Sequence, residues 1–126
     1  MLITLPWPDK RLFPNFKRAN HWRKYRNAER DARALGWDLA CEALPPHVRQ
    51  QIAHGDGPIR MTVTFYPPDR RNRDDDGCIG ALKNYRDGLA DALGVDDKRF
   101  RPHYAFAEPC KPGRIEVAIA VSGELG

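Results

Sequence analysis

Two segments of the chain, residues 59–66 and 114–121, alternate apolar and polar residues with a period of two. This pattern is typical of a half-buried β-strand, because successive side chains point to opposite faces of a sheet. A shorter apolar run at residues 2–5 predicts another strand, and residues 102–107 favour a fourth more weakly. We therefore expect a small β-sheet.

A helical period marks two longer segments, residues 21–44 and 77–93. In the first, apolar side chains recur every three or four residues and form one stripe; they are Ala28, Ala32, Leu35 and Leu39. Pro45 and Pro46 are expected to end this helix. We expect one loop after Pro6-Trp7-Pro8, through about Asn20, and another at residues 45–57.

The order of these elements is βαβαββ, which predicts an α+β fold with a small mixed β-sheet and two main helices. The chain has 126 residues, 41% of them hydrophobic, so it is long enough for one core and too short for two. We expect a single domain over residues 1–126.

Positive charge is concentrated near the start of the chain, within a net charge of +4. Nine Lys or Arg residues lie between Lys10 and Arg33, against only Glu29 and Asp31. Such a block is typical of nucleic-acid binders, the alternative being a solvated helix face. The candidate DNA-contacting residues in it are Arg18, Arg23, Lys24 and Arg26.

The three cysteines are widely spaced and form no CxxC pair, which argues against a zinc ribbon or a disulfide framework. No apolar run approaches 18 residues, and the first residues lack the charged start of a signal peptide. We expect a cytoplasmic protein without a membrane partner.

A mixed cluster of charge at residues 69–76 carries the strongest chemical signal. Three arginines (Arg70, Arg71 and Arg73) precede three consecutive aspartates (Asp74, Asp75 and Asp76), and Asp96-Asp97 follows twenty residues later. Clustered carboxylates suit Mg²⁺, which takes oxygen ligands, whereas the guanidinium fork suits phosphate. The combination indicates metal-assisted chemistry on a phosphodiester.

Within this cluster, Asp74 and Asp76 would point to the same side of an extended segment, and Asp75 away from it. Asp76 also opens the expected helix, where a carboxylate can simply cap backbone N–H groups. Lys83 lies on the same helical strip as Asp76 and could approach a bound phosphate. Its alternative role is an ion pair with Asp87, four residues on.

Asp97 poses a geometric problem, because a 17-residue helix is roughly 25 Å long and separates it from Asp76. One solution is that the loop at residues 94–98 folds back. The other is a two-fold dimer, in which Asp97 of one protomer approaches Asp74 and Asp76 of its partner.

Four segments of the chain resemble the RusA family of Holliday junction resolvases, which are small dimeric endonucleases often carried by prophages. They are Ile3-Thr-Leu-Pro-Trp-Pro8, the cluster at residues 69–76, residues 83–93 and Val95-Asp-Asp97. Order and spacing are similar over most of the chain and weakest at residues 40–58. The central acidic block is the most specific part of this resemblance.

The resemblance implies that Asp74 and Asp76 are the D-x-D metal ligands and Asp97 the third catalytic aspartate. The family's catalytic lysine lies one helical turn after the second aspartate, where this chain has Gly80, and Lys83 is the nearest lysine. An Asn that usually follows the second aspartate is here Gly77.

The resemblance further implies a bacterial or phage-encoded homodimer that uses Mg²⁺, with Mn²⁺ as an alternative, to resolve four-way DNA junctions by paired symmetric nicks. Mg²⁺ held by the three aspartates would activate a water and stabilise charge on the phosphate. Trp7, Phe13 and Trp22 are candidates for stacking on opened bases, although ordinary packing explains each one alone. Two other functions stay open: a non-catalytic protein that binds junctions or branched DNA, and a nuclease for other branched DNA.

Overall fold

Four strands form one mixed β-sheet in the computed structural model, which describes residues 1–121. The strands are β1 (Leu2–Pro6), β2 (Ile59–Tyr66), β3 (Phe100–Phe106) and β4 (Arg114–Val121). Their order across the sheet is β1-β4-β2-β3, with β2 and β3 parallel and the other pairs antiparallel. The four predicted strands are therefore confirmed, and the weakest of them begins two residues earlier than expected.

Four α-helices accompany the sheet, so the expected α+β class is confirmed with two more helices than predicted. They are α1 (Pro14–Ala19), α2 (Arg26–Ala43), α3 (Pro46–His54) and α4 (Asp75–Leu93). Single 3-10 turns lie at η1 (Lys10–Leu12), η2 (Trp22–Lys24) and η3 (Asp97–Arg99).

The prediction of loops was wrong for two segments, each of which contains a short helix. The stretch before Asn20 contains α1, and residues 45–57 contain α3; both helices have a proline in the first turn. Proline can open a helix because the first N–H groups need no intrahelical partner there. The expected helix at residues 21–44 also begins later, at Arg26, because a separate 3-10 turn precedes it.

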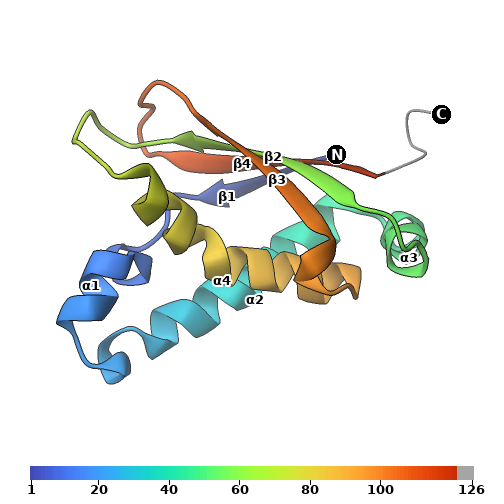
Figure 1. Cartoon of the computed structure of the whole chain (residues 1–126), viewed down its shortest axis with the longest axis horizontal. Coiled ribbons are helices and arrows are strands. Elements are labelled where there is room, and N and C mark those ends of the chain that lie inside the picture. Colours follow the sequence, from blue (N-terminus) through green and yellow to red (C-terminus); the bar gives the residue numbers. More distant parts are fainter. Residues whose placement is uncertain (122–126) are drawn as a thin grey trace.

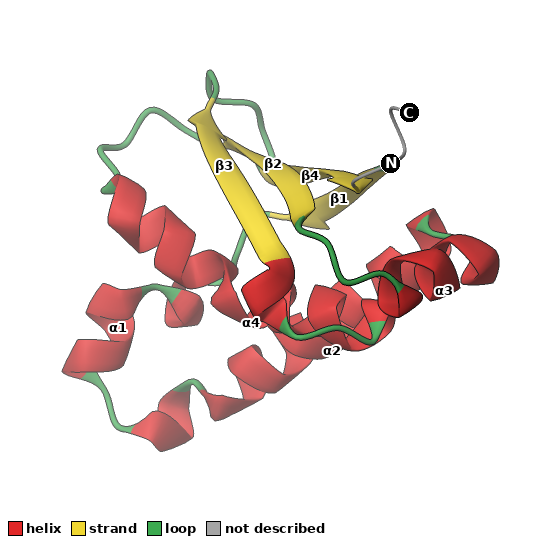
Figure 2. Cartoon of the chain, turned by 45° about the vertical axis from the view of Figure 1, so that its right-hand side comes forward, coloured by secondary structure: helices red, strands yellow, loops and turns green. Residues whose placement is uncertain are grey.

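The helices α2 and α4 pack beside each other on one face of the sheet, and the core lies between these two layers (Figures 1 and 2). Along β2 the predicted alternation is confirmed, since its apolar side chains are all buried; they are Ile59, Met61, Val63 and Phe65. Within residues 1–121, no helix is long and apolar enough to cross a membrane.

Close contact between α2 and α4 depends on small residues. The buried stripe of α2 consists of Ala28, Ala32, Gly36 and Ala40, while the predicted Leu35 and Leu39 are only half-buried at its edge. A Cβ atom on Gly36 would lie 2.5 Å from the Tyr85 carbonyl oxygen, and one on Gly88 would lie 2.1 Å from that of Arg33. The two backbones therefore approach too closely for a larger residue at either glycine.

Candidate functional site

The aspartate cluster forms the N-terminal end of α4. The Asp74 side chain accepts a hydrogen bond from the backbone N–H of Asp76 at 3.0 Å, so Asp74 is the N-cap of the helix. We expected Asp76 in that role, but it lies in the first turn together with Asp75. All three carboxylates are exposed, and negative charge there is stabilised by the helix dipole.

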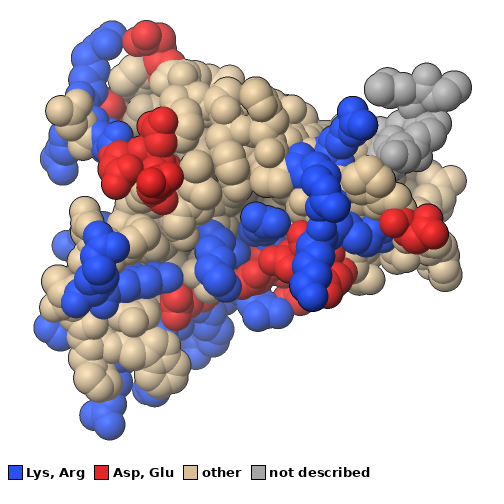
Figure 3. All heavy atoms as spheres, viewed as in Figure 1, with Lys and Arg blue, Asp and Glu red and all other residues tan. Residues whose placement is uncertain are grey.

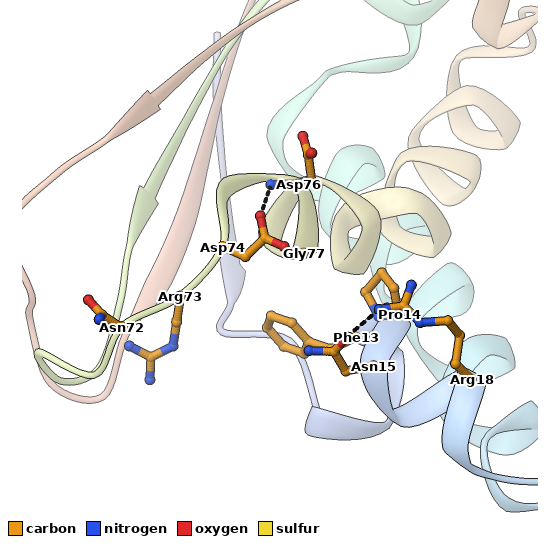
Figure 4. A pocket seen from close by; sticks show the side chains of 9 residues that line it. All are labelled: Phe13, Pro14, Asn15, Arg18, Asn72, Arg73, Asp74, Asp76 and Gly77. Atoms are coloured by element: carbon orange, nitrogen blue, oxygen red, sulfur yellow. Dashed lines mark hydrogen bonds between the residues drawn. The ribbon is translucent and has the colours of Figure 1, made fainter.

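Because α4 already begins at Asp75, the three carboxylates point in other directions than they would in an extended segment. Only Asp74 has extended backbone angles, so the premise that residues 74–76 form an extended segment was wrong. In Figure 4 the Asp74 carboxylate turns toward the first turn of α4, and the Asp76 carboxylate points away from it. The two residues nevertheless line one cavity, whereas Asp75 lines a neighbouring one.

The cavity beside Asp74 and Asp76 has a volume of about 280 Å³ and lies between the start of α4 and helix α1. The wall opposite the aspartates comes from α1 and the residue before it, and the remaining side from the 69–76 loop (Figure 4). Its lining residues are Phe13, Pro14, Asn15, Arg18, Asn72, Arg73, Asp74, Asp76 and Gly77. Asn15 was missed in the sequence because α1 itself was not predicted.

Two arginines from separate segments line this cavity together with the aspartates. The Arg18 guanidinium donates a hydrogen bond to the Asn15 side chain, which holds it along α1. Arg73 forms an ion pair with Asp69 at 2.8 Å, and its guanidinium lies 5.4 Å from the centre of the Trp7 ring. The lining of the cavity thus combines two aspartates with two arginines.

Asp69 organises the loop that carries the other arginines. The backbone N–H of Arg71 donates to its carboxylate, and Arg73 adds a side-chain hydrogen bond; in this order they hold the pKa of Asp69 below its usual value. Arg70 lies 3.4 Å from Glu108, and Arg71 lies 3.8 Å from Asp69. Both of these arginine side chains are 83% exposed and remain accessible to a ligand.

Lys83 lies two turns along α4 from the cluster and forms an ion pair. Its Nζ is 3.1 Å from an Asp87 carboxylate oxygen, which is the alternative role that its spacing indicated. The lysine side chain is 69% exposed, so this pair contributes only a few tenths of a kcal/mol. It does not hold Lys83 strongly in place.

Gly77 and Gly80, the two positions where the resemblance led us to expect other residues, have different surroundings. A Cβ atom on Gly80 would lie 2.7 Å from Cγ of Pro14, so α1 occupies the space that a lysine side chain would need. A Cβ atom on Gly77 would meet only the Cβ of Asp74, at 3.8 Å. A lysine at position 80 would therefore collide with α1, whereas an asparagine at position 77 would fit.

Asp97 lies beyond the opposite end of α4, in η3. The helix has 19 residues, about 28 Å, and ends at Gly94 in the left-handed conformation. No fold-back brings Asp97 to the other aspartates. Within residues 1–121, no three Asp, Glu, His or Cys side chains are grouped as a metal site.

The segment around Asp97 is held by arginines rather than by carboxylates. Arg86 donates to the Asp97 carbonyl oxygen at 3.3 Å and lies over the Phe100 ring, while its buried Nε has no hydrogen-bond partner. Arg99 donates to the carbonyl oxygens of Gly57 and Ile52. These contacts fix the backbone of η3 and leave the Asp97 carboxylate half-exposed.

A basic surface continues from the cavity along α1 and the start of α2. Figure 3 shows Lys and Arg side chains gathered at that end of the molecule, beside acidic atoms. Four exposed cations there form no ion pair with a described residue; they are Arg18, Arg23, Lys24 and Arg26. Arg26 also lies 5.4 Å from the centre of the half-exposed Trp22 ring.

Comparison with known proteins places the chain in a family. An uncharacterized protein of Xylella fastidiosa (strain Temecula1 / ATCC 700964) is 36% identical over 121 residues, which cover 96% of this chain and 75% of the relative. The chain belongs to the same family as that protein. No family model matches the chain.

The oxygen donors at the start of α4 suit Mg²⁺. Asp74 and Asp76 offer exposed carboxylates that form no ion pair with a described residue, and the amides of Asn15 and Asn72 line the same cavity. These are all hard oxygen donors. Mg²⁺ is commonly held by one or two carboxylates together with water and substrate phosphate, so the residues fit this ion.

Proposed function

We propose that this protein is a Mg²⁺-dependent, structure-specific endodeoxyribonuclease of the RusA type, which resolves four-way DNA junctions in recombination and repair. The observation that carries the proposal is the shared cavity, which Asp74 and Asp76 line together with Arg18 and Arg73, the two aspartates forming no ion pair with a described residue. Mn²⁺ is an alternative to Mg²⁺. The proposed setting is the cytoplasm of a bacterium, for a gene of bacterial or prophage origin.

In the proposed reaction, Asp74 and Asp76 would hold Mg²⁺, and the ion would supply charge stabilisation and a more acidic bound water. Arg18 and Arg73 bind the phosphate oxygens and orient the phosphodiester in the cavity. The 69–76 loop keeps Arg73 in place through Asp69. Hydrolysis leaves a 5′-phosphate and releases a 3′-hydroxyl. Lys83 remains a candidate for a further phosphate contact, since its exposed side chain can leave Asp87 at little cost.

A second copy of the chain completes the proposed site. Asp97 lies at the other end of α4, and its segment is held there by Arg86 and Arg99. An antiparallel arrangement of two α4 helices would bring Asp97 of one protomer to Asp74 and Asp76 of its partner. Such a dimer has two equivalent sites, which suits paired nicks in opposing strands.

The basic surface would bind the duplex arms of the junction. Its cations at residues 18–26, together with Arg70 and Arg71, are exposed and can contact phosphates without reading sequence. Binding should therefore weaken steeply as the salt concentration rises, because each phosphate contact releases counterions.

The deciding experiment is cleavage of a fixed four-way junction with Mg²⁺, beside linear duplex and flap DNA, by wild type and by Asp76→Asn. Paired symmetric nicks in the junction alone, lost in the variant while binding persists, are expected. Retained or tighter binding by Asp76→Asn is expected because one carboxylate that repels DNA is removed. Equal cleavage of the flap would instead favour a nuclease for other branched DNA.

A non-catalytic junction-binding protein is the second candidate, and two observations favour it: Asp74 caps α4, and Lys83 pairs with Asp87. Tight junction binding by wild type with no cut in Mg²⁺ or Mn²⁺ would establish this function. Asp76→Asn would then leave affinity essentially unchanged.

A further inference from the structure

A second cavity lies on the other side of the 69–76 loop from the first. Its volume is about 220 Å³, and Asn72 and Arg73 line both cavities, so the loop forms a shared wall. Asp74 and Asp76 belong to the lining of the first cavity, and Asp75 to that of the second. A ligand that extends across this wall can occupy both at once.

Aromatic rings form the floor and one side of the second cavity. Phe65 and Phe106 are adjacent in the β2–β3 pair, and their rings are stacked with centroids 5.0 Å apart and planes inclined by 9°. Trp7 meets Phe65 edge-on at 6.4 Å. Phe65 is completely buried, but Phe106 is 43% exposed.

Phe106 leaves part of its ring exposed at the second cavity. Phe106 is one of five large apolar side chains that stay substantially exposed among the described residues, and the one of these five that lines the second cavity. A flat ring at the edge of a cavity offers a surface on which another flat ring can stack.

Polar groups surround the aromatic floor. Arg71 and Asn72 offer N–H donors, and the Asn72 amide and the Asp75 carboxylate offer acceptors. Asp75 forms no ion pair within residues 1–121. An aromatic floor with donors and acceptors at its edge matches a nucleobase, which has a flat face and a hydrogen-bonding edge.

We propose that this cavity binds one unstacked nucleobase of the DNA strand whose phosphate lies at Asp74 and Asp76. The inference rests on the proposed function and adds to it the recognition of a base beside the cut. Stacking on Phe106 supplies the affinity, and the edge groups of Arg71, Asn72 and Asp75 distinguish one base from another. The protein would then prefer certain positions in a junction that offers several sequences.

The test is a binding experiment in EDTA, so that it is independent of cleavage. The probe is a four-way junction with 2-aminopurine at the nucleotide next to the crossover, and a fully paired duplex with the same label serves as the reference DNA. Wild type, Phe106→Ala and Phe106→Tyr are compared with Trp37→Ala, which removes another exposed aromatic side chain far along α2. Thermal unfolding verifies that each variant is folded.

Phe106→Ala is expected to weaken junction binding by about 5- to 100-fold, and to change the 2-aminopurine emission of the complex, while leaving duplex binding unaltered. Phe106→Tyr should bind like wild type, because it retains a ring. Equal junction affinity of Phe106→Ala and Trp37→Ala would overturn the inference while leaving the proposed nuclease intact. Failure of wild type to bind any DNA would overturn both.

Discussion

The two ends of α4 carry the two halves of the proposed site, and they are built differently. At the N-terminal end, the carboxylates of Asp74 and Asp76 are exposed beside a cavity, and no described cation pairs with them. At the C-terminal end, Asp97 lies in a short turn whose backbone is held by Arg86. The first end is open to a ligand, and the second is a fixed support for one carboxylate.

The helix α4 keeps the two halves of the proposed site apart. About 28 Å of helix lies between the two ends, so one copy of the chain cannot bring all three aspartates to one metal ion. The same helix gives two copies a fixed spacing.

Mixing two inactive variants should restore nicking if the ends of α4 come from different copies. Asp76→Asn and Asp97→Asn are each expected to lose at least about 100-fold in cleavage. Their heterodimer contains one intact site, so the mixture should cut one strand of a four-way junction. The measurement is single-strand nicking after the two proteins are refolded together. Complete inactivity of the mixture would place all three aspartates in the same copy.

A larger residue in place of Gly88 should push α2 away from α4 and destabilise both ends of α4. The new Cβ of Gly88→Ala would lie 2.1 Å from the Arg33 carbonyl oxygen, so we expect the free energy of unfolding to fall by about 2 kcal/mol despite better helix propensity. Chemical denaturation measures it. Gly77→Ala is the control, since its Cβ has room and its stability should stay equal or rise.

Removing the Arg86 guanidinium should loosen the support of Asp97. Arg86→Met keeps most of the side-chain volume but loses the hydrogen bond to the Asp97 carbonyl. We expect the Mg²⁺ concentration for half-maximal cleavage to rise about tenfold, as for other residues that orient a metal ligand. Arg60→Met, at an exposed position of β2, is the control. An unchanged Mg²⁺ dependence would show that Arg86 serves packing alone.

Substituting Lys83 and Asp87 one at a time distinguishes a role of Lys83 in phosphate binding from its ion pair with Asp87. If Lys83 contacts the phosphate, Lys83→Met should lose about tenfold in cleavage, which is the size of one charged hydrogen bond. Asp87→Asn breaks the same pair and should leave cleavage unchanged. Both should alter the free energy of unfolding by only a few tenths of a kcal/mol. Equal cleavage by the two variants would assign Lys83 to the ion pair only.

The smallest effect concerns pH and the link between α2 and α4. Arg33 binds the Asp91 carboxylate through two hydrogen bonds of 2.6 and 2.9 Å, which lower the pKa of Asp91 below its ordinary 3.8. Because the pKa of Asp91 is lower in the folded protein than in the unfolded chain, the ion pair stabilises the fold at any pH above the unfolded-state pKa. This stability is lost as the pH falls through the folded-state pKa. Since both side chains are exposed, the loss should stay below about 1 kcal/mol. Denaturation of wild type and Arg33→Met at about pH 7 and pH 3 should show a smaller decrease in the variant.

Much of the fold could be predicted because its signals are local. The alternation in residues 59–66 and 114–121 predicted β2 and β4 with their bounds, since a strand half-buried on one face must alternate. The short helices α1 and α3 were missed, because each has few apolar residues and begins at a proline that equally marks a loop.

The candidate site was predicted in part. Its local features could be read from the sequence, whereas contacts between distant segments could not. The order of residues along the chain already shows arginines beside aspartates, and a second aspartate pair twenty residues later. Local chemistry also decided that a carboxylate caps α4, though the structure gives that role to Asp74.

The surroundings of those residues depend on how the chain packs in three dimensions. This packing placed α1 over Gly80, brought Arg18 to the aspartates, stacked Phe106 on Phe65 and left Asp97 at the far end of α4. These relations join residues that are distant along the chain. They depend on how helices pack on the sheet and on one another, which no spacing within a single segment can encode.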